Sequence, residues 1–298
     1  MEHIPVLAED ILDLIKEMEV SPRTFLDGTF GRGGHLRMII NNYPQLKAVA
    51  MDRDADAISY GQDQFTSEVS AGQLLFVHGE FANFLSFEKN WSEFLGEDKF
   101  DLMLLDLGVS SPQLDVKERG FSFYHDGPLD MRMDQSQDLS AQEIVNTWSD
   151  QELSDLFYNL GEIKFPNKVV RDIVQRRKER EIDSTNDLAD LIVGACGWRK
   201  KGRHPATQYF MALRLAVNGE LKQVEEAIPK MIDRLNDNGR LLVITFHSLE
   251  DRIVKNLFRS SSKGRPARKK VIQAQRPEIK KNPRARSAKL RVFQREFL

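Results

Sequence analysis

Short apolar runs alternate with amphipathic segments through the first 110 residues of the chain. Uninterrupted apolar runs predict strands at four places: Thr24–Asp27, Lys47–Asp52, Leu74–His78 and Phe100–Leu107. Apolar residues at helical spacing predict helices over three segments between them: Leu36–Asn42, Ala55–Phe65 and Phe84–Leu95. This alternation is typical of a parallel sheet with helices on its faces.

The pattern changes after Leu107. Scattered glycine, proline and aspartate residues over Gly108–Asp134 predict a long ordered loop, and a loop of that length suggests a function. Helical spacing then continues to about Asp237. It opens with two capping boxes, Ser140 with Glu143 and Ser149 with Glu152. Further helices are expected at Lys168–Glu179, at Asn186–Ala195 and from Thr207 onward.

The last of these helices carries one long apolar stripe, which is typical of a core face. The stripe consists of Phe210, Leu213, Val217, Leu221, Val224, Ile228, Met231 and Leu235. Pro229 is expected to kink or divide it. The strand pattern returns at Arg240–Phe246 and Leu290–Phe297. We therefore predict an α/β domain in two parts, residues 1–112 and 206–298, around an inserted all-helical domain at 113–205 that recognises the substrate.

Length and composition are those of an ordinary globular protein, and 298 residues suggest two domains at roughly 150 residues each. The acidic N-terminal segment lacks the order of a signal peptide, and no apolar run approaches the ~20 residues that cross a bilayer. The single cysteine, Cys196, excludes an internal disulfide and a clustered-thiolate metal site, and we expect it to be buried. A cytoplasmic protein without a bound metal or membrane contact is expected.

Lysine and arginine concentrate in the C-terminal part of the chain. The net charge of −2 conceals 17 basic and four acidic residues from Arg240 to Leu298, against 26 and 41 in the residues before them. Proline and glycine interrupt two basic clusters, Lys263–Lys270 and Lys280–Arg286, which predicts extended arms suited to nucleic-acid phosphates. The alternative is a solvated tail, or one that binds the acidic body of the same chain.

Four glycines lie within seven residues where the first predicted strand turns into a helix, in the segment Asp27–His35. Glycines cluster where a backbone takes positive φ or approaches a ligand, so a nucleotide-type cofactor is expected. A dinucleotide fingerprint that starts at Gly31 needs its third glycine at position 36, where the chain has Leu36. Folds that bind S-adenosylmethionine use a related turn after a strand-end acid such as Asp27.

Two further acids end predicted strands. Asp52 lies 18 residues beyond Gly34, where a carboxylate can accept hydrogen bonds from ribose hydroxyls, and Asp106 lies at the end of the fourth strand. Together with Asp27 they favour S-adenosylmethionine as the cofactor. The alternative is a tight structural turn with Asp52 exposed.

Seven longer motifs extend this pattern over nearly the whole chain: Asp27–His35, Met51–Asp54, Leu104–Leu114, Arg119–Phe123, Asp126–Met133, Thr245–Arg252 and Asn282–Ser287. In this order they resemble the bacterial small-subunit ribosomal RNA methyltransferase H family. The resemblance implies a Rossmann-like class I S-adenosylmethionine-dependent methyltransferase domain. It also implies methylation of the exocyclic N4 of a cytosine in the decoding region of 16S rRNA, within the small ribosomal subunit. A monomer and a homodimer both stay open.

The resemblance also implies a set of cofactor-binding residues: Gly33, Gly34, His35, Asp52, Phe81, Asp106 and Gln113. The glycines and His35 would form the turn beside the cofactor, and Phe81 would lie against the adenine. Taken alone, Phe81 could be an ordinary core residue and His35 a surface or helix-capping histidine.

Cytosine N4 is a poor nucleophile because its lone pair is delocalised into the ring, so the enzyme must accept hydrogen bonds from the amine. Asp106, Ser110 and Ser111 are candidates for this role by location, although both serines could equally cap a helix or turn. Many amino-group methyltransferases carry an Asp or Asn followed by Pro-Pro-aromatic here, and this chain does not. The acceptor therefore stays open.

Six further residues are candidates for binding the RNA: His247, Ser248, Lys269, Lys270, Arg284 and Arg286. The first two follow a late strand and are expected near the target base, although Ser248 could instead cap a helix that begins at Leu249. The four basic residues are expected to contact phosphates. Two other functions stay open: methylation of an amino group in DNA, and RNA binding by a non-catalytic assembly factor. The intact glycine turn, Asp52 and Asp106 argue against the second.

Overall fold

The computed structural model describes residues 5–196 and 204–296. The chain divides into two compact units, the first formed by Met1–Gly108 with Leu221–Leu298 and the second by Val109–Glu220. Two expectations fall partly outside the described residues, namely the end of the last strand at Phe297 and positions 197–203 of the insert.

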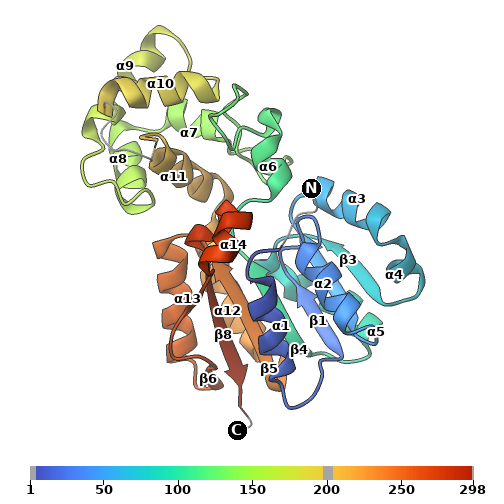
Figure 1. The fold of residues 1–298 in the computed structure, drawn as a ribbon. Coiled ribbons are helices and arrows are strands. Elements are labelled where there is room, and N and C mark those ends of the chain that lie inside the picture. Colours follow the sequence, from blue (N-terminus) through green and yellow to red (C-terminus); the bar gives the residue numbers. More distant parts are fainter. Residues whose placement is uncertain (1–4, 197–203, 297–298) are drawn as a thin grey trace. The chain divides into compact units, whose positions relative to one another are not determined.

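The first unit is built on one sheet with the strand order β3-β2-β1-β4-β5-β8-β6, and β7 also pairs with β8 (Figure 1). Its strands are β1 Thr24–Asp27, β2 Lys47–Asp52, β3 Leu74–His78, β4 Phe100–Asp106, β5 Leu235–Thr245, β6 Gly264–Pro266, β7 Ile272–Gln273 and β8 Lys289–Arg295. Strands β1 to β5 pair in parallel, whereas β8 runs antiparallel to β5, β6 and β7. The predicted Rossmann-like α/β fold is confirmed, and β1, β2 and β3 have their predicted bounds.

Helices cover both faces of this sheet. They are α1 Ala8–Lys16, α2 Gly34–Asn42, α3 Ala55–Gln64, α4 Thr66–Ser70, η1 Phe81–Phe87, α5 Glu88–Leu95, α12 Glu220–Asp233, α13 Ser248–Ser260, α14 Arg276–Lys281 and η3 Pro283–Ser287. Phe25 and Leu104 belong to a core shared with α1 and α2, whereas Leu26 and Leu105 belong to one shared with α5, α12 and α13. Neighbouring strand residues therefore serve opposite faces, as the strand period of two requires.

The second unit is helical in its described residues apart from one isolated bridge. Its helices are α6 Ser111–Asp115, η2 Lys117–Arg119, α7 Ala141–Thr147, α8 Asp150–Asn159, α9 Asn167–Glu179, α10 Thr185–Cys196 and α11 Thr207–Asn218. Ser140 and Ser149 cap α7 and α8 by accepting backbone hydrogen bonds at 3.1 and 3.2 Å. Cys196 is half-buried rather than buried, with its Sγ 3.8 Å from the Tyr209 hydroxyl.

The expected long loop is present but contains α6 and η2. The side chain of Asn218 holds its far end, because Nδ2 donates to the carbonyl of Met131 at 2.8 Å and Oδ1 accepts from the amide of Met133 at 2.9 Å. Both methionines are buried in the core of the second unit. The loop is therefore ordered by packing as well as by hydrogen bonds.

The long apolar stripe is divided at Gly219 and not at Pro229. Gly219 takes a φ of 58°, which ends α11, whereas Pro229 lies exposed inside α12. Phe210 on α11 packs into the core of the second unit, and Ile228 on α12 packs under the sheet. The second unit consequently extends to Glu220, beyond the expected boundary at residue 205, because α11 buries its apolar side there.

The basic C-terminal part does not form extended arms. Strands β6 and β7 pair with β8, and α14 and η3 fold between β7 and β8. Pro266 closes the short strand β6, and Pro283 begins η3. Among the described residues, no helix is both long and apolar enough to cross a membrane.

Candidate active site

Three strand-end acids lie at the carboxyl edge of the sheet. Asp27, Asp52 and Asp106 end β1, β2 and β4, which are neighbours in the order β2-β1-β4. In the strand order β1 is followed by β2 in one direction and β4 by β5 in the other, so this is the topological switch point where open α/β sheets bind ligands. The sequence prediction that each of these acids ends a strand is confirmed.

The glycine turn joins β1 to α2 beside these acids. Gly31 and Gly33 take positive φ values of 55° and 71°. A Cβ on Gly33 would lie 2.5 Å from a ring carbon of Phe30, and one on Gly28 would lie 2.6 Å from Leu105 Cδ2. A side chain is therefore excluded at Gly33 by both backbone conformation and space, and at Gly28 by space alone.

Asp52 is fixed by two backbone amides. Its Oδ2 accepts a hydrogen bond from Gly31 at 2.7 Å, and its Oδ1 accepts one from Asp54 at 2.9 Å. Burial raises the pKa of Asp52 to about 6, although these two amide hydrogen bonds lower it. Each carboxylate oxygen retains a second acceptor position, so the group can also accept from two ribose hydroxyls.

Asp106 is held by its backbone while part of its carboxylate stays without a partner. Its amide donates to Thr29 Oγ1 at 2.6 Å. Within the described part of the chain, the buried Asp106 Oδ1 has no hydrogen-bond partner. Burial, together with the Glu250 carboxylate, raises the pKa of Asp106 to about 7. A buried acceptor in this state fits a ligand that donates a hydrogen bond or carries positive charge.

His35 links this acid to the N-terminal segment. Its Nε2 lies 2.9 Å from the carbonyl oxygen of Val6, so Nε2 carries a hydrogen, and its Nδ1 lies 3.6 Å from Asp106 Oδ2. When His35 is neutral, its Nδ1 carries no hydrogen and faces a lone pair of Asp106 Oδ2. A proton on either His35 or Asp106 would relieve this repulsion. Burial lowers the pKa of His35 and raises that of Asp106, so it favours the neutral form of both groups.

Asp27 is the most deeply buried of the three acids, with 2% of its surface exposed. Its Oδ1 accepts a hydrogen bond from the Thr29 amide at 3.1 Å. Burial raises the pKa of Asp27 to about 7, against the lowering effects of His35 and of the Thr29 amide. Asp27 therefore shapes the glycine turn and adds to the same coupled group of acids.

Phe81 begins η1, directly after β3. A Cβ on Gly28 would lie 3.3 Å from Phe81 Cβ, which places this residue beside the glycine turn. Phe81 is half-buried and packs against the core under the sheet. Its position agrees with a wall of the cofactor site, while contact with an adenine stays a prediction.

His247 caps the helix that follows β5, and Ser248 does not. Helix α13 begins at Ser248, and His247 Nδ1 accepts a hydrogen bond from the Glu250 amide at 3.5 Å. Glu250 in turn accepts from the amides of Phe246 and His247 at 2.9 and 3.4 Å. Glu250 is 1% exposed and close enough to Asp106 to raise its pKa. Sequence reasoning missed this role, although the His247 to Glu250 spacing is that of a capping box.

Ser110, Ser111 and Gln113 belong to the second unit. Ser110 caps α6, and its amide donates to Gln113 Oε1 at 2.9 Å in a capping box. The capping interpretation of Ser110 is confirmed, and Ser111 is the first residue of that helix. The expected roles of these residues beside the methyl group stay predictions.

The basic candidates fall into two groups. Lys263, Arg265 and Arg268 pair with acids of the same chain, namely Asp233, Glu296 and Glu17. The alternative that the tail binds the acidic body of the chain is thus partly realised. Lys269, Lys270, Arg284 and Arg286 are exposed. No ion pair is found for the two lysines among the described residues, so they remain available for phosphates.

The carboxyl edge therefore fits the expected cofactor. Asp52 offers acceptors for a ribose, and the buried Asp106 Oδ1 has no hydrogen-bond partner among the described residues. Acidic groups with raised pKa values suit a ligand that carries a positive charge.

Comparison with known proteins shows which family the chain belongs to. A model of the MraW methylase family matches residues 1–296. Ribosomal RNA small subunit methyltransferase H of Bdellovibrio bacteriovorus is 53% identical over 296 residues, covering 99% of this chain and 88% of that protein. The protein of the same name from Gloeothece citriformis is 43% identical over 297 residues, covering 99% and 94%. Among solved structures, a putative rRNA-methylase from Clostridium thermocellum has a TM-score of 0.48 and 11% identity, covering 98% of this chain and 99% of that one.

Proposed function

The chain belongs to the MraW methylase family, and we propose that it methylates the exocyclic N4 of a cytosine in the decoding region of 16S rRNA. Family membership confirms the expected cofactor, S-adenosylmethionine, and a class I methyltransferase fold. The relatives named as small-subunit rRNA methyltransferases support ribosomal RNA as the substrate. The observation that carries the proposal is the acid-lined switch point around the glycine turn, within a chain that matches the family from end to end.

In this proposal the first unit holds the cofactor. S-adenosylmethionine supplies an electrophilic methyl group on a positively charged sulfur. Asp52, already fixed by the amides of Gly31 and Asp54, accepts hydrogen bonds from the ribose hydroxyls. Gly33, Gly34 and the backbone of His35 form the turn beside the cofactor, and Phe81 lies against the adenine. Gln113 is the one expected cofactor-binding residue that belongs to the second unit, and its role stays a prediction.

Asp106 is the proposed acceptor for the cytosine amine. Its buried Oδ1 has no partner among the described residues, so it can accept a hydrogen bond from N4 and direct the nitrogen lone pair toward the methyl group. When the new N–C bond formed and the bond from that carbon to sulfur broke, N4 would become positively charged and would have to lose a proton, which an ionised Asp106 could accept. Positioning and exclusion of water supply most of the remaining rate. Ser110 and Ser111 stay secondary candidates because Ser110 already caps α6.

The remaining candidates bind the RNA in this proposal. His247 and Ser248 lie at the carboxyl edge after β5, and Lys269, Lys270, Arg284 and Arg286 contact phosphates. The second unit contributes to substrate recognition. The cytosine must leave any base stack to reach the methyl donor, which a single-stranded region of rRNA makes inexpensive.

Transfer of a radiolabelled methyl group tests the proposal directly. The protein is incubated with labelled S-adenosylmethionine and either small ribosomal subunits, naked 16S rRNA or duplex DNA. We expect label in RNA, in the assembled subunit or the free form, and none in DNA. Digestion to nucleosides and mass spectrometry then separate N4-methylcytidine from C5-methylcytidine.

Three outcomes would contradict the proposal. Labelled DNA with unlabelled RNA would assign the chain to DNA, and binding of rRNA without any transfer would assign it to assembly. Label on C5 would remove Asp106 as the acceptor of an amine proton and leave only the coarser assignment to rRNA.

A further inference from the structure

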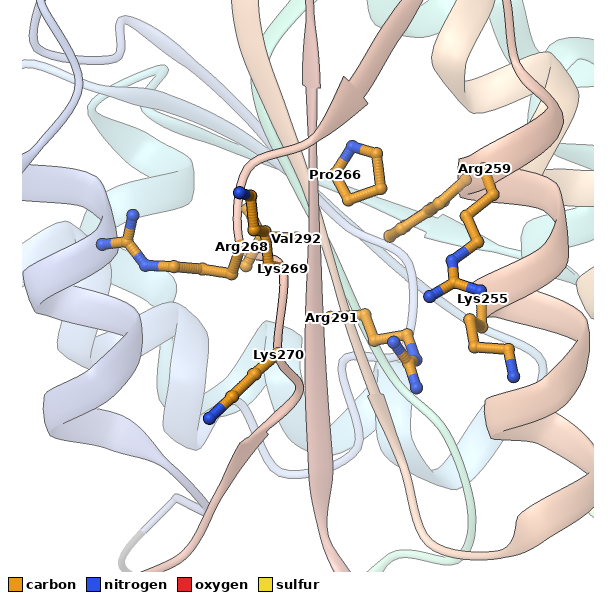
Figure 2. Close-up of a pocket in the computed structure, with 9 residues that line it drawn as sticks. Lys255, Arg259, Pro266, Arg268, Lys269, Lys270, Arg291 and Val292 are labelled. Carbon is orange, nitrogen blue, oxygen red and sulfur yellow. The ribbon is translucent and has the colours of Figure 1, made fainter.

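A pocket of about 380 Å³ lies on the first unit, between α13 and the segment that follows β6. It is lined by Lys255, Phe258, Arg259, Pro266, Arg268, Lys269, Lys270, Arg291 and Val292. Figure 2 shows Lys255 and Arg259 coming from α13 on one side and Arg268 to Lys270 from the opposite segment, with β8 between them. Six of the nine lining residues are basic and none is acidic, so the pocket attracts anions.

The positive charge of this pocket is only partly neutralised. Arg291 binds Asp251 through its Nε at 2.6 Å, and Arg268 pairs with Glu17. Lys255, Arg259, Lys269 and Lys270 have no ion pair among the residues at positions 5–196 and 204–296. Four uncompensated cations around one concavity form a site for phosphate groups rather than for a neutral ligand.

The floor of the pocket indicates how the ligand is recognised. Phe258 is 2% exposed and its ring packs on Phe293, with the centroids 5.3 Å apart. Val292 is equally buried, and Pro266 carries no backbone donor. This floor offers neither an exposed ring for base stacking nor side-chain acceptors for base edges, so recognition rests on phosphates and not on sequence.

The pocket lies away from the carboxyl edge of the sheet. Val292 pairs with Leu242, three residues before the end of β5 at Thr245, and α13 runs back from the carboxyl edge. Lys255 and Arg259 follow Ser248 by seven and eleven residues, which places them ~10 and ~16 Å along the helix. A strand of RNA that reaches both the edge and the pocket must extend over several nucleotides.

We propose that this pocket binds backbone phosphates of the ribosomal RNA at a distance from the methylated base. The proposal rests on the proposed function and adds a second contact to it, made by Lys255 and Arg259 of α13 together with Lys269 and Lys270. It anchors the RNA independently of sequence, while the carboxyl edge selects the base.

The double variant K255Q/R259Q tests this anchor, because glutamine keeps a polar side chain and removes the charge. The control is K89Q/K222Q, which neutralises two exposed lysines elsewhere on the first unit. Binding of a decoding-region fragment of 16S rRNA is measured by fluorescence anisotropy from 50 to 300 mM salt. We expect the slope of log K against log salt to fall by ~1.4 in K255Q/R259Q, at about 0.7 per lost phosphate contact. The control keeps the wild-type slope.

Unchanged binding of S-adenosylmethionine and an unchanged melting temperature establish that K255Q/R259Q is folded. In a folded variant, a wild-type salt slope would overturn the proposal. The wild type could bind inorganic phosphate in calorimetry while the variant keeps the wild-type salt slope of RNA binding. That result would assign the pocket to a small anion and would also overturn the proposal. Methyl transfer to rRNA by the wild type is measured in parallel. If the wild type transfers no methyl group, the proposed function is contradicted. If it does transfer one and K255Q/R259Q keeps the wild-type salt slope, only the proposed phosphate anchor is contradicted.

Discussion

The carboxyl edge of the sheet and the basic pocket differ in the sign of their charged groups and in how far these groups are exposed to solvent. At the edge, Asp27, Asp52 and Asp106 are enclosed by the fold, and burial raises all three pKa values. At the pocket, Lys269 and Lys270 lie exposed without ion pairs among the described residues. Enclosed charges act over short distances and are sensitive to protonation, whereas exposed charges act over a Debye length of ~10 Å and are weakened by salt. One sheet thus carries a site governed by pH and another governed by ionic strength.

The largest effect is expected from Asp106→Asn at the edge. The amide keeps the size of the side chain but cannot accept a proton, so kcat should fall by at least ~100-fold. Binding of S-adenosylmethionine should change less than tenfold. Single-turnover methyl transfer measures the first quantity and calorimetry the second. Asp98→Asn, at an exposed acid of the same unit, is the control. A kcat within threefold of wild type would remove Asp106 as the acceptor.

The second-largest effect is expected from Asp52→Ala, on the affinity for S-adenosylmethionine. The ribose hydroxyls lose a charged acceptor, and the amides of Gly31 and Asp54 lose theirs, so the Kd for S-adenosylmethionine should rise by roughly 10- to 100-fold. Since the lost contacts are short and enclosed, the factor should be the same at 50 and 300 mM salt. Calorimetry at both concentrations measures it, and unaltered affinity would exclude Asp52 from the site.

The pH dependence of cofactor binding should be smaller but diagnostic. Because the pKa of Asp106 and that of Asp27 are raised to about 7, both carboxyls are protonated below that pH and ionise above it. Affinity for the positively charged S-adenosylmethionine should therefore rise several-fold from pH 6 to pH 8. The product S-adenosylhomocysteine is uncharged at sulfur and should change less. Equal pH profiles for the two ligands would show that these acids do not face the sulfur.

The smallest effect at moderate salt is expected from Lys269→Ala with Lys270→Ala. Loss of two exposed cations should lower the salt slope of RNA binding by ~1.4 and leave cofactor affinity unaltered. Anisotropy titrations over a range of salt measure the slope. A slope equal to that of the wild type would assign both lysines to a solvated surface and weaken the contrast between the two regions.

The strands were predictable because their burial is continuous. In β1 all four residues are buried, so the apolar run and the strand have the same bounds. The division at Gly219 was missed because Pro229 is the stronger breaker in an isolated helix. Proline has no amide hydrogen, so Pro229 cannot donate to the backbone carbonyl of Glu225, four residues earlier. Both residues are exposed in the structure, so water can donate to that carbonyl instead.

The residues of the site could be identified from the sequence, but the contacts between them could not. The acids and glycines are visible in the sequence, since each follows a strand. The contact of His35 with Val6 depends on the path of the N-terminal segment. The effect of Glu250 on the pKa of Asp106 depends on β5 lying beside β4. Spacing along the chain carries no information on which strands are neighbours. The same limit concealed the basic pocket, whose lysines and arginines come from α13, from the segment after β6 and from β8.

The half-buried Cys196 has a practical consequence for spectroscopy. It is the single thiol in the sequence and lies on α10 of the second unit. A thiol-reactive fluorophore or spin label therefore reports on that unit alone, without any cysteine having to be removed first. One added cysteine at an exposed position of the first unit, such as Lys89→Cys, completes a donor and acceptor pair. Distances between the two units can then be followed in solution as cofactor and RNA are added.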